Sequence, residues 1–462
     1  MTPHHTPRRT VPWCCLSIAV ACVCACHAPV PTTTPRQASP PAGSLAQLNG
    51  EVFDEVWAIV RDTHPDPTIN KGQWNDARLQ FRERAVHSRG DQELRSVLED
   101  MLETLGESHF AIIPHSVSGT AEATGGWSGM TLTVIGHDAV VTRVDPRGPA
   151  ARTGVRNGWI LTEAEGDPLA TVIEPFGEPR TSLERLQRAH AIDGFVGGRP
   201  GMTPRYTFVD GGGSKHEVDI TLDDPPGEVV TLGNLPPFPA EADSRWLADD
   251  EISALGVDPA RIGRVGYLRF SIWMPALSAR IDDALFEFRS ADGVIIDLRG
   301  NPGGLGLMAT GVAGHFLATP TSLGSMRSRD TTIEFKTNPR TVDRTGATVG
   351  VCRGQLAILI DGHTGSTSEI FAAGLVDAGR AECFGQRSAG AALPATTHTL
   401  KNGDVFLHAI GDFNTPSGVS VEGAGAFQRV GDAPTRADYT ASLDPELRDA
   451  LQWIASQRTP QP

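Results

Sequence analysis

Positive charge is scarce in this sequence. Its 462 residues include 40 Lys and Arg against 55 Asp and Glu, for a formal net charge of −15. Contact with a phosphate backbone needs clustered positive charge, so this balance argues against a nucleic-acid partner. Long apolar runs are also lacking. No stretch of about 20 apolar residues follows position 26, so nothing in the body of the chain is predicted to span a membrane.

Metal-ligand and phosphate-loop motifs are missing as well. The chain after position 26 has no His-Glu-x-x-His motif and no paired Cys-x-x-Cys motif, so no metal site is predicted. The glycines at 211–213 are not followed by Lys-Ser or Lys-Thr at phosphate-loop spacing, and we expect a hairpin turn there. Neither a metal nor an organic cofactor is implied.

The N-terminus has the pattern of a targeting segment. Arg8 and Arg9 precede an apolar run over 13–25, which has the length of a signal-peptide core. Val23-Cys-Ala-Cys26 resembles a bacterial lipoprotein signal with Cys26 as the lipidated residue, and the alternative is a secretory signal that is cleaved away. We expect a signal at 1–26, a flexible linker at 27–44, and export to the bacterial cell envelope, in the periplasm or on the outer surface, with membrane attachment through the N-terminal lipid only.

Lipidation at Cys26 would leave Cys352 and Cys383 as the only cysteines of the mature protein. An oxidising compartment would permit a disulfide between these two residues. The alternative is two separate buried thiols, and the sequence leaves both open.

The length predicts two or three domains. Residues 45–117 are expected to form a helical domain, because apolar residues recur at helical spacing there. One such stripe runs from Leu94 to Leu105, with Asp91 as a plausible N-cap and Gly106 at the end. The stripe needs a surface to pack against.

Residues 118–223 change to short strands, among them 130–134 and 139–144. The strand, Pro-Ala-Ala helix and glycine turn that end near Leu161 resemble a PDZ domain of the bacterial protease type. The resemblance implies capture of a peptide by strand addition, with the amides of 125–130 near its carboxylate. The alternative is a β-rich spacer that binds nothing. The Pro- and Asp-rich segment 224–260 is expected to be a linker.

Residues 261–462 have an α/β pattern. Strands are predicted at 265–270, 293–298 and 356–360, and the last two are apolar at consecutive positions, as parallel strands are. The last strand stops at Asp361, and a glycine-rich turn then presents Ser366 in front of a helix expected over 369–378. Such a turn exposes a hydroxyl group, and the helix amides can stabilise an oxyanion. The alternative is that Ser366 only caps the helix.

A second glycine loop, Asp297-Leu-Arg-Gly-Asn-Pro-Gly-Gly304, follows the preceding strand. Both loops are expected at the same carboxyl edge of a parallel sheet, where sites form in α/β proteins. This loop, Gly365-Ser-Thr-Ser-Glu369 and the PDZ-like segment together resemble the C-terminal-processing (tail-specific) serine peptidases, which include the tricorn core protease. The resemblance implies an α/β peptidase core of the ClpP/crotonase-like kind, with an N-terminal helical domain and a PDZ-like domain.

The resemblance also implies roles for individual residues. The nucleophile maps onto Ser366, and the oxyanion donors map onto the backbone of Gly303, Gly304 and Thr367. Ser368 is then the expected helix cap. The Ser-Lys branch of the family has a lysine base at the position of Ala391, and the four lysines of this chain lie elsewhere, at Lys71, Lys215, Lys336 and Lys401.

In the residues that activate the nucleophile, this sequence resembles the tricorn branch of the family more closely. Leu105-Gly-Glu-Ser-His109 maps His109 onto the base and Ser108 onto its companion, and Glu422 maps onto a late carboxylate. Ser108 would relay between Glu422 and His109, and an imidazole has a suitable pKa for this task. His363, in the nucleophile loop itself, is a rival base. The residues that follow Gly425 depart from the family pattern, which weakens the assignment of Glu422.

The sequence therefore predicts a serine-type endopeptidase or carboxyl-terminal-processing peptidase that acts on proteins or peptides, which the PDZ-like groove would help to bind. The alternative is a non-catalytic protein that binds peptides or lipophilic ligands on the same fold, and the missing lysine favours it. The natural substrate, the position of cleavage and the oligomeric state stay open.

Overall fold

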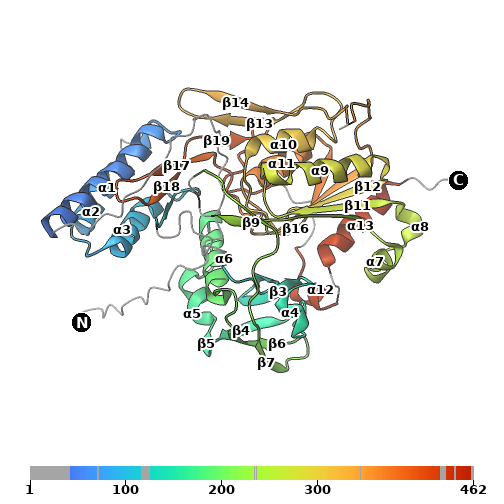
Figure 1. Cartoon of the computed structure of the whole chain (residues 1–462), viewed down its shortest axis with the longest axis horizontal. Coiled ribbons are helices and arrows are strands. Elements are labelled where there is room, and N and C mark those ends of the chain that lie inside the picture. Colours follow the sequence, from blue (N-terminus) through green and yellow to red (C-terminus); the bar gives the residue numbers. More distant parts are fainter. Residues whose placement is uncertain are drawn as a thin grey trace.

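The structure is a computed structural model that describes residues 42–458, except 70–71, 116–124, 234, 236, 344, 427–432 and 442–443. The predicted signal at 1–26, with Cys26, lies outside the described residues. Most of the predicted linker lies outside them too, but helix α1 begins at Ala42, inside the expected linker. Figure 1 shows the N-terminal helices in blue, a β-rich part in green and the α/β core in yellow to red.

Three helices form the N-terminal part, α1 (Ala42–Thr63), α2 (Gln73–Val86) and α3 (Asp91–Glu103). The predicted apolar stripe of α3 is buried among them. Gly90 precedes α3, and Asp91 is its first residue and not its cap. None of the helices in the described ranges is long and apolar enough to cross a membrane.

The apolar faces of the N-terminal helices pack against a small antiparallel sheet. Its order is β1-β18-β17, from β1 (Ala111–Ile113), β18 (Val405–Ala409) and β17 (Ala395–Thr399). Ile112 and Phe406 share one hydrophobic core with the helices. Val405 of β18 belongs to the hydrophobic core of the α/β part, whereas its neighbour Phe406 packs on the N-terminal helices, so β18 connects the two parts.

The β-rich part is one antiparallel sheet with helices against it. Its strands are β2 (Met130–Ile135), β3 (Asp138–Val144), β4 (Ile160–Ala164), β6 (Arg205–Val209) and β7 (Lys215–Asp219), in that order, with β5 (Asp167–Pro168) beside β4. The 211–213 turn joins β6 and β7, as predicted. β2 is an edge strand, and α6 (Ser182–Val196) packs near it. The sequence analysis did not predict α6.

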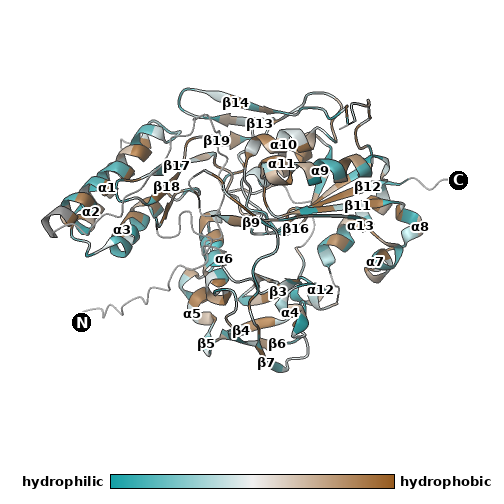
Figure 2. Cartoon of the chain, viewed as in Figure 1, coloured by the Kyte–Doolittle hydropathy of each residue, from teal (hydrophilic) through white to brown (hydrophobic). Residues whose placement is uncertain are grey.

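The core is a five-stranded sheet of order β10-β11-β12-β15-β16. Its strands are β10 (Ala242–Trp246), β11 (Val265–Phe270), β12 (Gly293–Asp297), β15 (Gln355–Ile360) and β16 (Ala381–Gly385), and only β10 runs antiparallel. The predicted strands at 265–270, 293–298 and 356–360 are confirmed to within a residue. The segment around β12 is largely hydrophobic (Figure 2).

Helices cover both faces of this sheet. Ile296 and Ile358 point to the hydrophobic core shared with α9 (Pro275–Glu287), α10 (Gly306–Ala313) and α11 (Thr367–Asp377). Ile295 and Leu359 point to the other core, shared with α7 (Asp249–Ala254), α8 (Pro259–Ile262) and α13 (Pro445–Gln457). Burial on both faces explains the consecutive apolar residues of these strands.

The remaining elements connect or flank these parts. They are α4 (Pro149–Arg152), α5 (Ala170–Ile173), η3 (Glu174–Phe176), β8 (Glu228–Val230), β9 (Phe238–Ala240), η4 (Phe288–Ser290), β13 (Ser322–Arg327), β14 (Thr332–Lys336), β19 (Asp412–Asn414) and α12 (Arg436–Ala441). β14, β13 and β19 form a separate three-stranded sheet.

The prediction of a linker at 224–260 is wrong. Within it β10 completes the edge of the core sheet, and Leu247, Ile252 and Leu255 are buried beneath that sheet. The physical reason is that a few spaced apolar residues suffice to dock a segment, although Pro and Asp dominate its composition.

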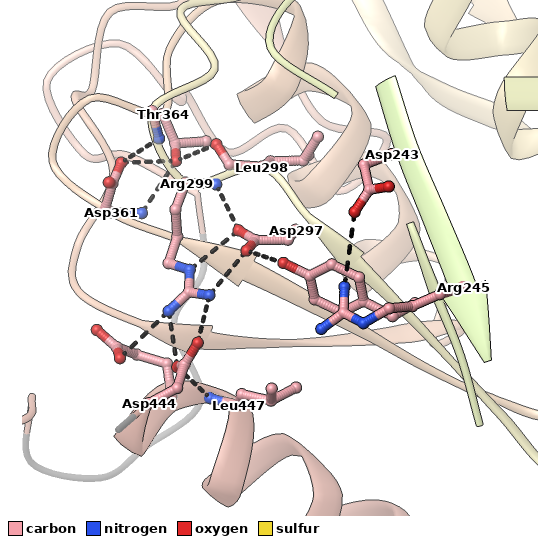
Figure 3. A network of polar contacts seen from close by, with 12 residues as sticks. Asp243, Arg245, Asp297, Leu298, Arg299, Asp361, Thr364, Asp444 and Leu447 are labelled. Atoms are coloured by element: carbon pink, nitrogen blue, oxygen red, sulfur yellow. Dashed lines mark hydrogen bonds and ion pairs between the residues drawn. The ribbon is translucent and has the colours of Figure 1, made fainter. Parts of the chain in front are cut away.

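The first glycine loop, 297–304, is anchored by the buried guanidinium of Arg299 (Figure 3). Arg299 donates to both carboxylate oxygens of Asp297, at 2.9 and 2.7 Å, and to both of Asp444, at 2.8 Å each. Tyr267 adds a hydrogen bond to Asp297 at 2.6 Å. Burial alone would raise the pKa of Asp297, but Arg299 holds that pKa well below its usual range. The end of β12 is thereby tied to the start of α13.

Asp361 ties the end of β15 to the same place. Its Oδ1 accepts hydrogen bonds from the amides of Gly300 and His363, both at 3.0 Å. Thr364 Oγ1 donates to the carbonyl of Leu298 at 2.9 Å (Figure 3). The two loops at the carboxyl edge of the sheet are therefore held to each other.

Of the two alternatives for the cysteines, the structure has the separate buried thiols and no disulfide between them. Cys352 and Cys383 are free thiols, and both are buried in the same hydrophobic core. Cys352 Sγ instead donates to the carbonyl of Leu285, 3.4 Å away. Burial raises the pKa of Cys352 to about 11 and raises the pKa of Cys383 further, so both thiols stay protonated and unreactive.

This state of the cysteines is testable by alkylation. Denatured, unreduced protein should be alkylated at both Cys352 and Cys383, and the folded protein at neither within minutes, because burial and a raised pKa disfavour the thiolate. Peptide mass spectrometry measures both. A disulfide-linked pair of peptides would contradict the structure.

Replacement of Arg299 by Met should destabilise the fold by about 3–5 kcal/mol, because Asp297 would remain buried without its cation. Urea denaturation measures the free energy of unfolding. The matched control is Arg205→Met, since Arg205 and its partner Asp219 are both exposed, and that variant should be nearly as stable as the parent. Equal stability of the two variants would show that the Arg299 network does not support the fold.

Candidate active site

Ser366 lies in a strained turn at the start of α11. Its φ of 51° is positive, and only two other non-glycine residues in the described ranges share this property, His109 (φ 62°) and Glu165. Positive φ in a residue other than glycine is uncommon and concentrates at functional sites. Ser366 is 1% exposed, and its Oγ has no hydrogen-bond partner in the described part of the chain. A buried hydroxyl without a partner is rare.

Helix capping does not explain Ser366. Its Oγ faces the amide of Glu369 as in a capping box, but makes no hydrogen bond of normal geometry. Ser368 does not cap the helix either, contrary to expectation. Its Oγ donates to the carbonyl of Asn301 at 3.1 Å and accepts from the indole N–H of Trp273 at 2.8 Å. Ser368 therefore fastens the nucleophile helix to the other glycine loop.

Gly303 lies directly against Ser366. A Cβ atom at Gly303 would stand 2.6 Å from Ser366 Cβ, and its φ is +112°, so both space and conformation require glycine. Its amide, however, donates to Asn301 Oδ1 at 3.0 Å. We expected the Gly303 amide to be an oxyanion donor, but this amide already has a hydrogen-bond acceptor.

The other two expected oxyanion donors are close together. Thr367 Oγ1 donates to the carbonyl of Gly304 at 2.7 Å, which joins the two residues. Neither the Gly304 amide nor the Thr367 amide has an acceptor among the residues that the structure describes. Thr367 is the first residue of α11, where the amides of a helix point outward without partners.

Glu369 organises the loop around Ser366, and the sequence analysis missed this role. Its Oε2 accepts from the amides of Ser366 at 3.1 Å and Ala391 at 2.9 Å. Its Oε1 accepts from Ser388 Oγ at 2.6 Å and the Gly390 amide at 2.7 Å. Burial raises the pKa of Glu369 to about 7, and these four donors offset part of that effect.

The structure brings Ser108, His109 and Glu422 into contact. Ser108 Oγ lies 2.7 Å from His109 Nδ1 and 3.0 Å from Glu422 Oε2. The Ser108 amide also donates to Glu422 Oε1, at 3.1 Å. If Ser108 gives its only hydroxyl proton to the carboxylate, His109 Nδ1 carries the proton that Ser108 Oγ accepts. The other ring nitrogen, Nε2, is then left with a free lone pair.

His109 Nε2 is buried and has no hydrogen-bond partner in the described ranges. Burial lowers the pKa of His109 to about 4, so the ring is neutral at neutral pH. Burial also raises the pKa of Glu422. A neutral imidazole with a bare nitrogen is the state that a general base requires.

One short segment connects the two halves of the site. The Ser366 amide donates to the carbonyl of Ala391 at 2.7 Å, and the Ala392 amide donates to Glu422 Oε2 at 2.8 Å. Ser366 and His109 are therefore held on either side of 391–392, although they do not hydrogen-bond to each other. Ala391 lies beside Ser366, where the Ser-Lys branch has its lysine.

His363 does not suit the role of a base. Its Nε2 lies 3.1 Å from Asp193 Oδ2, on α6 of the β-rich part. Burial opposes a charge on the ring, but Asp193 outweighs it and raises the pKa of His363 to about 9. The ring is therefore protonated near neutral pH and has no free lone pair. The pair instead joins the nucleophile loop to α6.

A cavity of about 360 Å³ opens beside the nucleophile loop. Gly365 and Ala391 line it on the side of the core, and Met130 and Leu186 line it on the side of the β-rich part. Residues from β2 and α6 thus form one wall of a space that ends next to Ser366.

Two family models match this chain. Residues 264–427 match peptidase family S41, and residues 49–103 match the tricorn protease C1 domain. The first range contains the two glycine loops and Ser366, and the second covers most of the N-terminal helices.

Curated relatives agree with the family models. The chain is 24% identical over 422 residues to carboxyl-terminal-processing peptidase 3 of Arabidopsis thaliana, which covers 87% of this chain and 71% of the relative. It is 25% identical over 409 residues to a carboxyl-terminal-processing protease of Synechocystis, with 87% and 85% covered.

Solved structures with the same fold include the photosystem II D1 C-terminal processing protease, at 19% identity and a TM-score of 0.55, with 88% of this chain and 98% of that chain covered. Mature CPAF is similar at 14% identity and a TM-score of 0.58, with 90% and 99% covered. The family models and the curated relatives point to one kind of enzyme, a hydrolase. Residues 264–427 thus match peptidase family S41, and the chain as a whole is similar to carboxyl-terminal-processing serine peptidases.

Proposed function

We propose that this peptidase works without the family lysine, through Ser366 as nucleophile, His109 as base, and Ser108 with Glu422 as a relay. The observation that supports this most is the pair of buried atoms without partners, Ser366 Oγ and His109 Nε2. Unpaired buried polar atoms cost free energy, and they persist where a reaction uses them.

In the first step Ser366 Oγ attacks the carbonyl carbon of the peptide bond, and His109 Nε2 takes its proton. The imidazolium that forms is stabilised by Ser108, which accepts from Nδ1–H while it donates to Glu422. His109 then gives the proton to the leaving amine, and the C–N bond breaks. Water attacks the resulting ester with His109 again as base, which releases the acid and restores the Ser366 hydroxyl.

The amides of Gly304 and Thr367 are the oxyanion donors in this proposal. Each such donor contributes about 100–1000-fold in rate. Gly303 acts differently from the expectation. It supplies the space and backbone conformation that let the glycine loop approach Ser366, while its own amide stays with Asn301.

The β-rich part serves as a PDZ-like peptide-binding domain in this proposal. Its edge strand β2 has α6 beside it, and both line the cavity that leads to Ser366. A peptide that adds to the edge of β2 would obtain main-chain hydrogen bonds there. The substrate would thus be a protein or peptide in an extended conformation.

Three further features, which concern the core fold, the location and the lipid anchor, belong to the same proposal. The core is of the ClpP/crotonase-like kind, and the protein is exported to the cell envelope with a lipid on Cys26. The competing function is a non-catalytic binding protein, which the alanine at 391 in place of the lysine favours.

A fluorophosphonate probe separates the enzyme from the binder, because it reacts only with an activated serine. The parent should be labelled at Ser366 and should hydrolyse peptides. Ser366→Ala should lose both, and His109→Ala should lose activity by about 1000-fold or more, since serine needs a base. His363→Ala, the control for the rival base, should keep its labelling. A well-folded parent without labelling would favour the binder.

The activity should fall only at low pH on the acid side of the pH–rate profile. Because burial lowers the pKa of His109 to about 4, its base form is present above that pH, and kcat/KM at pH 5.5 should stay near its neutral value. A pH–rate profile with a midpoint near the ordinary histidine value of about 6.5 would contradict His109 as base. Glu422→Gln separates the carboxylate, since a limb that moves in this variant belongs to Glu422.

A further inference from the structure

His64 contacts the turn that carries Ser108 and His109. It directly follows the last residue of α1, and its polar side chain is buried. Its Nδ1 accepts a hydrogen bond from the Asp66 amide at 3.1 Å, so the ring proton is on Nε2. Nε2 lies 2.8 Å from Glu107 Oε2 and therefore donates to that carboxylate. Both nitrogens of this ring are thus engaged, each in a defined direction.

The same ring contacts both residues that flank Ser108 and His109. Glu107, the residue before them, accepts its hydrogen bond. Phe110, the residue after them, stacks on it, with ring centroids 6.2 Å apart and an interplanar angle of 13°. His64 therefore holds the segment 107–110 at its first and its last residue.

This turn needs support because its backbone is strained. His109 has a φ of 62°, in the left-handed region that residues other than glycine rarely adopt. Such a conformation persists only where the surrounding structure fixes it. The hydrogen bonds from Ser108 to Glu422 fix part of the turn, and the contacts of His64 fix its two ends.

The place of His64 is itself fixed by a third segment. Arg329, in the turn between β13 and β14, donates to the carbonyls of His64 and Arg61, both at 2.6 Å. These carbonyls lie at the end of α1, where helix carbonyls lack partners within the helix. The β13–β14 hairpin thus holds the end of α1 from which His64 reaches the turn (Figure 1).

We propose that His64, acting through Glu107, is a positioning residue for the base, and that it holds the turn 107–110 so that His109 Nε2 faces the Ser366 hydroxyl. This inference rests on the proposed peptidase function and adds a residue to its machinery. A displacement of about 1 Å can lower a rate about 100-fold, so the support of the turn matters for catalysis. Neither His64 nor Glu107 is among the residues that line the cavity beside Ser366, so the effect is on kcat and not on KM.

Two substitutions of His64 isolate its hydrogen bond to Glu107. Asparagine can accept from the Asp66 amide but is too short to reach Glu107, whereas glutamine places an amide N–H near the position of Nε2. His64→Asn should lower kcat and the rate of fluorophosphonate labelling at Ser366 by about 10–100-fold, with KM little changed, and His64→Gln should restore most of the loss. Glu107→Ala should match His64→Asn, and the double variant should lose no more than either single variant.

The matched control is His398→Asn. His398 also pairs with a glutamate of the N-terminal part, because its Nε2 lies 3.3 Å from Glu55 Oε1 and joins β17 to α1. This variant should keep the kcat of the parent. Full kcat in His64→Asn, no recovery in His64→Gln, or losses that add up in the double variant would overturn the proposal. Thermal unfolding shows which variants are folded, and Glu107→Ala carries the test if His64→Asn is not.

A measurement without catalysis separates this inference from the peptidase mechanism. In the Ser366→Ala background, NMR of protein isotopically labelled at the histidine nitrogens reports the tautomer of His109, whose signals are assigned by their loss in His109→Ala. The ring should carry its proton on Nδ1, and His64→Asn should shift the signals toward a mixture of tautomers. This shift, with a parent that is neither labelled nor active, would refute the peptidase mechanism only. Unchanged His109 signals in His64→Asn, with normal labelling and hydrolysis by the parent, would refute the role of His64 only.

Discussion

The buried carboxylate of Glu369 is the constraint on which the geometry of the site depends. Four donors from two separate segments converge on it, so the backbone of Ser366 and the loop 388–391 cannot move independently. The next residue along that loop, Ala392, reaches Glu422 and through it Ser108 and His109. Two buried carboxylates, Glu369 and Glu422, thus connect Ser366 to His109, and their many donors explain why burying acidic residues there is tolerated.

At position 391, where the Ser-Lys branch has its lysine, this chain contacts Ser366 through a backbone atom. At 391–392 the carbonyl of Ala391 accepts from the Ser366 amide, and the amide of Ala392 donates to Glu422. In the proposed mechanism the base comes from elsewhere in the fold, and His109 belongs to a segment more than 250 positions earlier. This arrangement needs the N-terminal helices to be docked, since His109 follows α3 and precedes β1, the strand that pairs with β18. Folding of the N-terminal part and assembly of the site are therefore coupled.

The β-rich part contributes residues directly to the site. Asp193 on α6 holds His363 in the nucleophile loop, and β2 forms a wall of the cavity. The conformation of the loop that carries Ser366 therefore depends on how the two parts sit together.

Local patterns in the sequence determined the parts of this protein that short-range physics controls. The core strands follow from runs of apolar residues, the turn of Ser366 follows from its glycines, and the approach of Ser108, His109 and Glu422 followed from the family pattern. Tertiary structure decided the rest. It placed 224–260 in the core, left the two cysteines unpaired, and engaged the Gly303 amide with Asn301. The reason is that each of these outcomes depends on partners distant in the sequence or on space that only the packed chain defines, whereas periodicity and turn chemistry report on neighbours along the chain.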